Sequence, residues 1–170
     1  TAAPSEERCA VEMETFALLD RLGIPYTWVA HDMANTIEDC AAVDAALGIS
    51  ICKNLFLCNR QKTEFYLLAM PGDKLFQTKE LSRQLGTARL SFAPPERMEE
   101  LLGCAPGSAS VLGMAYDKSH QVHLLMDREV YESEWFGCHP CKSDATLRIQ
   151  TRDLLNIFFP YTGHSVTVVD

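Results

Sequence analysis

The sequence lacks any apolar run that approaches the roughly 20 residues needed to span a bilayer as a helix. The first eight residues, TAAPSEER, contain neither a basic patch nor an apolar stretch, so we expect no secretory signal. A basic surplus is missing too, because the formal net charge is −8. This argues against a general nucleic-acid binder and leaves room for a local basic patch only. We therefore expect a cytoplasmic protein with no membrane partner.

Motifs that would assign a chemistry directly are also missing. The chain contains no P-loop, no dinucleotide fingerprint and no Gly-x-Ser-x-Gly elbow. Its 170 residues, 47% hydrophobic and 22% charged, are typical of one ordinary globular domain, and we expect a single domain over residues 1–170. Most of the seven cysteines lie within apolar segments, which favours free buried thiols in a reducing compartment.

Periodicity and stop signals predict the elements of an α/β (α+β) fold. Helices are predicted at 7–22, 35–47, 78–85, 94–103 and 151–159. Strands are predicted at 25–31, 51–58, 65–70, 88–93, 111–115, 122–126, 145–149 and 165–169. A polar turn at 59–62 joins two of these strands into a hairpin. Such an order indicates a mixed or mainly antiparallel sheet with helices around it.

Residues 51–58, ICKNLFLC, place a lysine and an asparagine inside an otherwise apolar run. A buried charge is costly unless it is paired or faces a wet cleft. Lys53 can extend from a strand edge to solvent. With Asn54 beside it, a pair of side chains facing a ligand is equally consistent with the residues.

The loop LLGCAPGSAS (101–110) combines two glycines, a proline and two serines. Such a loop can turn backbone N–H groups towards a ligand. Donors of this kind stabilise the oxyanion that develops in ester hydrolysis. Most clusters of this composition are ordinary loops, so the segment alone assigns no activity.

The segment GCHPC (137–141) has the cysteine spacing of a redox pair or of half a zinc site. A zinc site needs about four ligands. HQVH (120–123) offers two histidines, but alternation along a strand would put them on opposite faces. No strand–CxxC–helix arrangement surrounds the motif. We expect no metal and no cofactor, and keep a thiol or metal module built on Cys138 and Cys141 as an alternative.

Five segments occur together in one order: KNLFL (53–57), ARLSFA (88–93), LLGCAPGSAS (101–110), GCHPCKSDATL (137–147) and TRDLL (151–155). Taken together they resemble the prolyl-tRNA editing proteins, YbaK/ProX-type relatives of the editing domain in bacterial prolyl-tRNA synthetase. The resemblance runs over residues 24–169. It implies one α/β domain with a mixed, partly barrel-like sheet. It also implies hydrolysis of mischarged aminoacyl-tRNA, most typically alanine attached to tRNA for proline.

The resemblance also implies roles for matching residues. Lys53 and Gly107 match the catalytic positions: the lysine lies near the terminal adenosine and the ester, and the glycine N–H binds the scissile carbonyl. The implied substrate-binding residues are His31, Asn54, Ser108 and His139. Of these, the asparagine orients the substrate and the two histidines line the amino-acid pocket.

The implied chemistry is direct attack of water on the ester, without a protein nucleophile. A lysine is charged at neutral pH and is a poor base, so it would hold phosphate or ribose and offset transition-state charge. The neighbouring ribose hydroxyl of the substrate would help to move the proton. A small cavity would admit alanine and exclude proline by size. Two positions depart from the family pattern: Val111 stands where relatives have proline, and Ser143 where they have asparagine.

The expected partner is the tRNA acceptor end carrying a small amino acid, bound by a monomer. The acidic chain would grip that end through Lys53, Lys74, Lys79 and Arg83, or prolyl-tRNA synthetase would deliver the substrate. A non-catalytic module that binds aminoacyl-tRNA or an amino acid is a further alternative.

Overall fold

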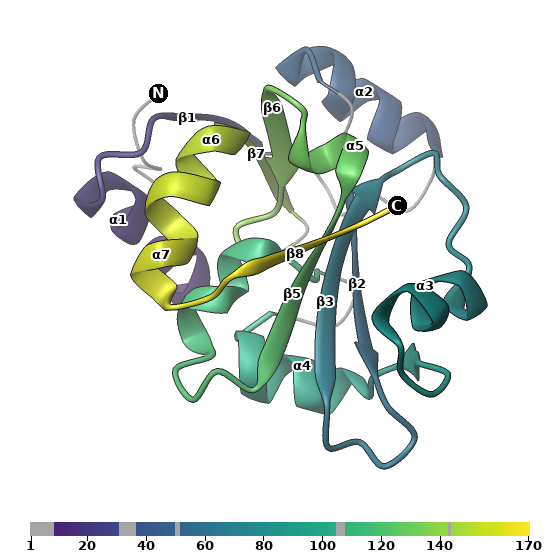
Figure 1. The fold of residues 1–170 in the computed structure, drawn as a ribbon. Coiled ribbons are helices and arrows are strands. Elements are labelled where there is room, and N and C mark those ends of the chain that lie inside the picture. The colour runs from purple at the N-terminus through teal and green to yellow at the C-terminus, as the bar shows by residue number, and fades with distance from the viewer. Residues whose placement is uncertain (1–8, 31–36, 50–51, 105–107, 143) are drawn as a thin grey trace.

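The computed structural model describes residues 9–30, 37–49, 52–104, 108–142 and 144–170, which form two sheets with helices around them (Figure 1). The smaller sheet has the order β1-β7-β6. Its strands are β1 (Tyr26–Ala30), β6 (Trp135–Cys138) and β7 (Ala145–Gln150). Both pairs are antiparallel.

The larger sheet has the order β4-β2-β3-β5-β8. Its strands are β2 (Cys52–Cys58), β3 (Phe65–Pro71), β4 (Ser91–Phe92), β5 (Val122–Asp127) and β8 (Val166–Val169). The β2–β3 hairpin and the β2–β4 pair are antiparallel, whereas β5 runs parallel to both β3 and β8. The expected mixed sheet is confirmed. Neither sheet closes into a barrel within the described residues.

The five predicted helices are present and end close to the predicted positions, and one further short helix, at 128–131, was not predicted. They are α1 (Ala10–Arg21), α2 (Ile37–Leu47), α3 (Thr78–Leu85), α4 (Pro95–Leu102), α5 (Arg128–Tyr131), α6 (Thr151–Asp153) and α7 (Phe159–Thr162). A π-helical stretch, η2 (Leu154–Phe158), joins α6 to α7. Gly86 and Gly103 end α3 and α4 in the left-handed conformation that glycine adopts without strain. No described helix is long and apolar enough to cross a membrane.

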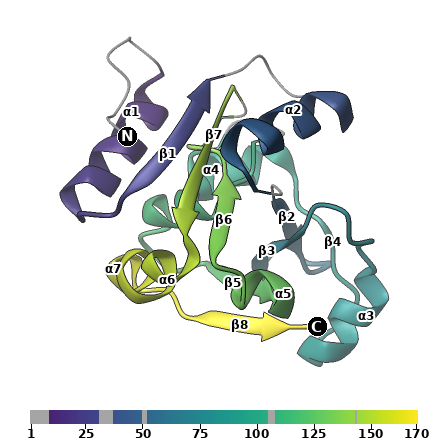
Figure 2. The ribbon, with the colours of Figure 1, turned by 90° about the horizontal axis from the view of Figure 1, so that it is seen from above.

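Two apolar clusters lie on opposite faces of the larger sheet. The main cluster includes Phe56 and Cys58 of β2, together with residues of α1, α4 and the smaller sheet. The second cluster includes Leu57, with Leu55 packed at its edge, and lies under α3. Seen from above in Figure 2, α3 and β4 lie on one side of β2, and β6 and β7 lie on the other. Successive side chains of β2 point to opposite faces of the sheet, so they lie alternately in the main cluster and in the cluster under α3.

The strand predicted at 111–115 is wrong. These residues belong to a 3-10 helix, η1 (Val111–Tyr116), which begins with the Ser110 side chain accepting a hydrogen bond from the Leu112 N–H at 3.2 Å. The segment is buried and apolar without a period of two, and this pattern does not distinguish a buried turn of helix from a strand. Strand 88–93 is shortened to Ser91–Phe92, and β6 was not predicted.

Candidate functional site

Lys53, the second residue of β2, is half-buried, and its ammonium donates a hydrogen bond to the backbone carbonyl of Lys74. Lys74 follows β3, and its own ammonium lies 2.6 Å from the buried carboxylate of Asp127. The hydrogen bond to that carboxylate raises the pKa of Lys74. The charge of Lys74 is thus already compensated. An ammonium has three N–H donors, and Lys53 uses one of them within the described residues.

Asn54 lies on the other face of β2. It shares that face with Phe56, whereas Lys53 shares its face with Leu55. The Oδ1 atom of Asn54 is buried and has no hydrogen-bond partner. The structure therefore places the expected lysine–asparagine pair around one strand, with the two side chains on opposite faces.

A second buried oxygen without a partner belongs to Ser108, whose side chain is 0% exposed. Buried polar atoms are normally hydrogen-bonded, and an exception calls for an explanation such as a ligand or an ordered water. Ser108 lies just before Ser110, which donates a hydrogen bond to the backbone carbonyl of His139 at 2.5 Å. The loop that ends at Ser110 is thus tied to the segment that carries the expected pocket histidine.

His139 follows β6 and is half-buried. Its Nδ1 lies 2.7 Å from the backbone carbonyl of Ala145, the first residue of β7. Because a carbonyl only accepts, this contact places a proton on Nδ1. The ring is thereby oriented by the smaller sheet, while its backbone is held by Ser110.

The β2 strand contacts this region through Cys52. A hydrogen bond from the Gly137 backbone reaches the Cys52 sulfur, and burial raises the pKa of this thiol to about 11. Cys52 lies on the same face as Asn54, two residues along the strand. Asn54, Ser108 and His139 therefore lie on segments joined by two direct contacts, one from the Gly137 backbone to Cys52 and one from Ser110 to the His139 carbonyl.

Cys138 and Cys141 are buried, and burial raises the pKa of the Cys138 thiol well above its ordinary value. The pKa of the Cys141 thiol is also raised well above its ordinary value, first by a hydrogen bond with Cys104 and then by burial. A reactive thiol needs a lowered pKa and access to solvent. These two cysteines have neither property, which argues against a thiol-based redox centre.

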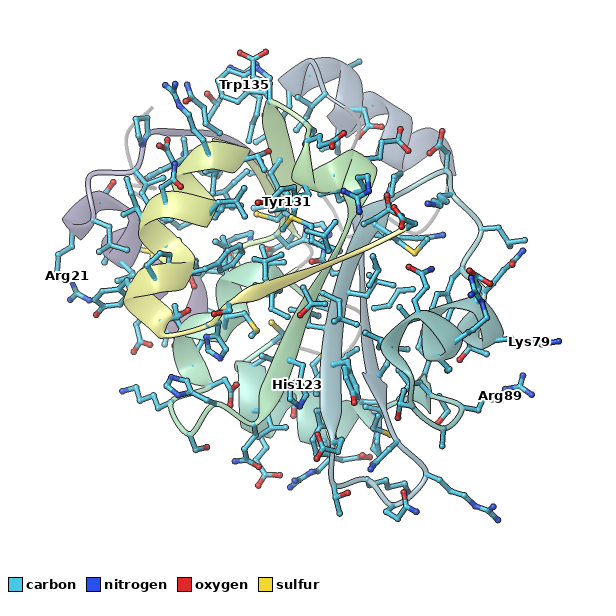
Figure 3. The ribbon with its side chains drawn as sticks, viewed as in Figure 1. Arg21, Lys79, Arg89, His123, Tyr131 and Trp135 are labelled. Atoms are coloured by element: carbon cyan, nitrogen blue, oxygen red, sulfur yellow. The ribbon has the colours of Figure 1, made fainter. Side chains whose placement is uncertain are left out.

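No group of three or more histidine, cysteine, aspartate or glutamate side chains in the described part of the chain could hold a metal ion. The two histidines of HQVH do not share a strand. His123 lies on β5 (Figure 3). Its Nε2 lies 2.9 Å from a carboxylate oxygen of Glu64. His120 precedes β5 and lies 3.0 Å from the carbonyl of Thr162.

Two expected site residues, His31 and Gly107, lie outside the described residues, as does the departure at Ser143. Among the expected phosphate-binding residues, Arg83 is paired with Glu80 on the exposed side of α3. Ser110 was not predicted as a site residue. Its position directly before an apolar run was the available signal, because serine is a favoured N-cap.

The family model for the aminoacyl-tRNA editing domain matches residues 31–157. The chain belongs to this family. The prolyl-tRNA editing protein ProX of Acetoanaerobium sticklandii is 31% identical over 141 residues, which cover 83% of this chain and 86% of ProX. Prolyl-tRNA synthetase associated domain-containing protein 1 of Danio rerio is 31% identical over 160 residues, covering 93% of this chain and 85% of the relative.

A solved structure described as a candidate trans-editing enzyme for prolyl tRNA synthetase has the same fold, with a TM-score of 0.69 at 18% identity. The alignment covers 95% of this chain and 98% of that one. The resemblance to YbaK/ProX-type editing proteins is confirmed. The part matched to the editing-domain family contains Lys53, Asn54, Ser108 and His139, so the site described above lies within the editing domain.

Proposed function

We propose that this editing domain, acting as one unit over residues 1–170, hydrolyses mischarged aminoacyl-tRNA in trans. Alanine on tRNA for proline is the proposed substrate: the ProX relative is named a prolyl-tRNA editing protein, and the family resemblance implies alanine. The observation that supports this most is the pair of buried oxygens without partners, Asn54 Oδ1 and Ser108 Oγ. They lie on the two segments that flank His139, where a ligand with polar groups would satisfy both.

The reaction is the attack of water on the ester carbonyl carbon. The carbonyl oxygen becomes an oxyanion, and we assign its stabilisation to the backbone N–H of Gly107. When the tetrahedral intermediate collapses, the bond to the ribose oxygen breaks and that oxygen takes a proton, through the neighbouring ribose hydroxyl. The products are the free amino acid and uncharged tRNA. Aminoacyl esters are already activated, so positioning and oxyanion donors suffice.

In this proposal the two faces of β2 bind different parts of the substrate. Lys53 holds the phosphate or ribose of the terminal adenosine on the α3 side. Asn54, Ser108 and His139 contact the amino acid on the other side. β4 pairs with β2 only at Leu57 and Cys58, and no other described strand covers that edge of Cys52–Leu55. In this proposal the substrate passes that edge and reaches both faces.

The size of the pocket sets specificity in this proposal. An apolar pocket discriminates poorly between side chains that differ by one methylene, but it excludes a larger group by contact. Alanine would enter, whereas the ring of proline would not. Hydrolysis of alanyl-, prolyl-, seryl- and cysteinyl-tRNA, each on tRNA for proline, measures this directly.

The proposed function is tested by deacylation of Ala-tRNA for proline. Lys53→Ala is expected to lower kcat/KM by about a hundredfold, because an oxyanion or phosphate contact of this kind contributes a factor of about 10²–10³. Lys62→Ala, in the exposed hairpin turn, is the matched control and is expected to leave the rate unchanged. Wild-type protein that binds Ala-tRNA without turnover would support the non-catalytic module instead.

The thiol alternative is tested with the double variant Cys138→Ser and Cys141→Ser. It is expected to keep deacylation within a few-fold of wild type, provided that its unfolding transition stays above the assay temperature. A loss of activity as large as that of Lys53→Ala, in a variant that remains folded, would contradict the assignment of these cysteines as bystanders.

A further inference from the structure

An exposed apolar surface lies beside the candidate site. It is formed by Leu75, Phe76 and Phe92, and we call it the 75/92 surface. Leu75 is 76% exposed and Phe92 65% exposed, more than any other large apolar side chain in the described residues. The rings of Phe76 and Phe92 lie 5.8 Å apart. The ring of Phe76 packs against that of Phe92, and Phe92 itself faces solvent. Packing of the core therefore does not account for the exposed position of Phe92.

The strand register places the 75/92 surface on the same face of β2 as Lys53. Phe92 lies directly opposite Leu57, and residues directly opposite each other project from the same face. Lys53 and Leu57 are an even number of residues apart, so they share that face. Four residues of strand between them span about 13 Å. The carbonyl that accepts from Lys53 belongs to the residue just before Leu75.

The segment that carries the 75/92 surface is basic, although the net charge of the chain is −8. Residues 74–92 contain four basic residues and one acidic residue, and two of the basic residues are paired, Lys74 with Asp127 and Arg83 with Glu80. Lys79 and Arg89 are exposed, and neither makes an ion pair within the described part of the chain. Figure 3 shows both side chains extending outward on the side of α3. An exposed aromatic ring beside unpaired basic side chains is a combination that favours binding of single-stranded nucleic acid, whose bases stack and whose phosphates are negatively charged.

We propose that the 75/92 surface binds the single-stranded 3′ end of the tRNA, with one base stacked on Phe92 and phosphates beside Lys79 and Arg89. Stacking on an aromatic side chain accepts any base. The span of about 13 Å from Lys53 to Leu57, the strand partner of Phe92, corresponds to about four stacked nucleotides at 3.4 Å each. The RNA would run along the α3 face towards Lys53. This inference rests on the proposed function for the chemistry at the end of the RNA.

Fluorescence anisotropy with a labelled single-stranded RNA ending in CCA tests the inference without any need for turnover. Phe92→Ser is expected to weaken binding about tenfold, the usual effect of removing one stacking ring. Phe92→Tyr keeps a stacking ring and is expected to bind as wild type does. Tyr161→Ser, at an aromatic side chain 54% exposed on α7, is the matched control and is expected to change nothing. Arg89→Gln is expected to reduce the slope of log affinity against log salt by about one.

Equal RNA affinity of wild type and a folded Phe92→Ser variant would overturn the inference. If Phe92→Ser converts a dimer into a monomer and leaves the RNA affinity unchanged, the surface binds a second copy of the chain. That result would also overturn the inference. Hydrolysis of the alanyl ester of adenosine separates the two proposals: Phe92→Ser is expected to retain that activity. Wild-type protein that binds the RNA and hydrolyses neither ester would refute the proposed function and leave this inference standing.

Discussion

The Ser110 side chain connects the loop before η1 to the segment that carries His139 by a hydrogen bond. The substitution Ser110→Ala removes this hydrogen bond and tests its importance. The Ser110 side chain is buried, donates to the His139 carbonyl at 2.5 Å and accepts from the Leu112 N–H at 3.2 Å. Removal of the hydroxyl leaves a buried N–H unpaired, which costs about 1–3 kcal/mol. It also removes an N-cap, which costs about 0.5–2 kcal/mol.

These two effects overlap, because the unpaired N–H is the group that the cap satisfies. The expected loss in the free energy of unfolding is therefore about 1–3 kcal/mol. For a chain of this size, such a loss corresponds to a decrease in Tm of about 2–12 °C. Urea unfolding of wild type and Ser110→Ala measures it. Ser119→Ala is the matched control, since Ser119 is exposed and its hydroxyl accepts a hydrogen bond from the Gln121 side chain at 2.8 Å.

Ser110→Ala is also expected to lower kcat more than it raises KM, measured well below the unfolding transition. The reason is that the His139 backbone loses its contact with the loop, and small displacements of positioning groups reduce rates strongly. Unchanged stability would refute the assigned hydrogen bonds. Reduced stability with unchanged kcat would refute the positioning role and leave the structural one.

Three further predictions concern stability. Gly113→Ala is expected to cost about 1–3 kcal/mol, because a Cβ would lie 2.7 Å from the carbonyl oxygen of the last residue of α4; an unchanged urea midpoint would contradict this. His164→Ala is expected to cost about 1–3 kcal/mol, because the buried carboxylate of Asp117 loses its 2.9 Å hydrogen bond with His164 but keeps those from the Gln121 and Val122 backbone N–H groups; thermal unfolding measures the loss. Stability is expected to fall as pH rises from 9 to 12, because burial raises the pKa of Cys52 from 9.0 to about 11 and of Tyr116 from 10.0 to about 12. A thiol or phenol whose pKa is higher in the folded state contributes its full stabilisation at a pH below the unfolded pKa. This contribution is lost as the pH rises towards the folded pKa. A urea midpoint that does not change over this pH range would contradict the assignment.

Elements with local signals were predicted well. The ends of α3 and α4 were predicted because Gly86 and Gly103 adopt positive φ, a preference that belongs to the residue itself. The β2–β3 hairpin was predicted because its polar turn separates two apolar runs. In these cases the local preference and the tertiary structure agree.

Elements whose structure depends on distant contacts were not predicted. Residues 111–114 of η1 are buried in the core, and all of them are apolar. Such a run shows no alternation of apolar and polar residues, so its sequence pattern does not distinguish a helix from a strand. β6 has only four residues, and its pairing with β7 and the contact of Gly137 with Cys52 define it. The identities of Lys53 and Asn54 as candidate residues came from the sequence. Their opposite directions and the hydrogen bond from Lys53 to the Lys74 carbonyl required the fold.

The register of β2 decides which chemistry reaches each face of the sheet. A slip of one residue would exchange the directions of Lys53 and Asn54, and with them the phosphate side and the amino-acid side of the proposed site. Apolar burial opposes such a slip: Phe56 and Cys58 fill the main core, while Leu57 lies in the cluster under α3. The slip would move an aromatic ring into a layer packed for leucine, and well-packed interiors tolerate such changes poorly. The apolar residues of this strand, which touch no substrate, therefore fix the positions of the two polar residues that the proposed reaction needs.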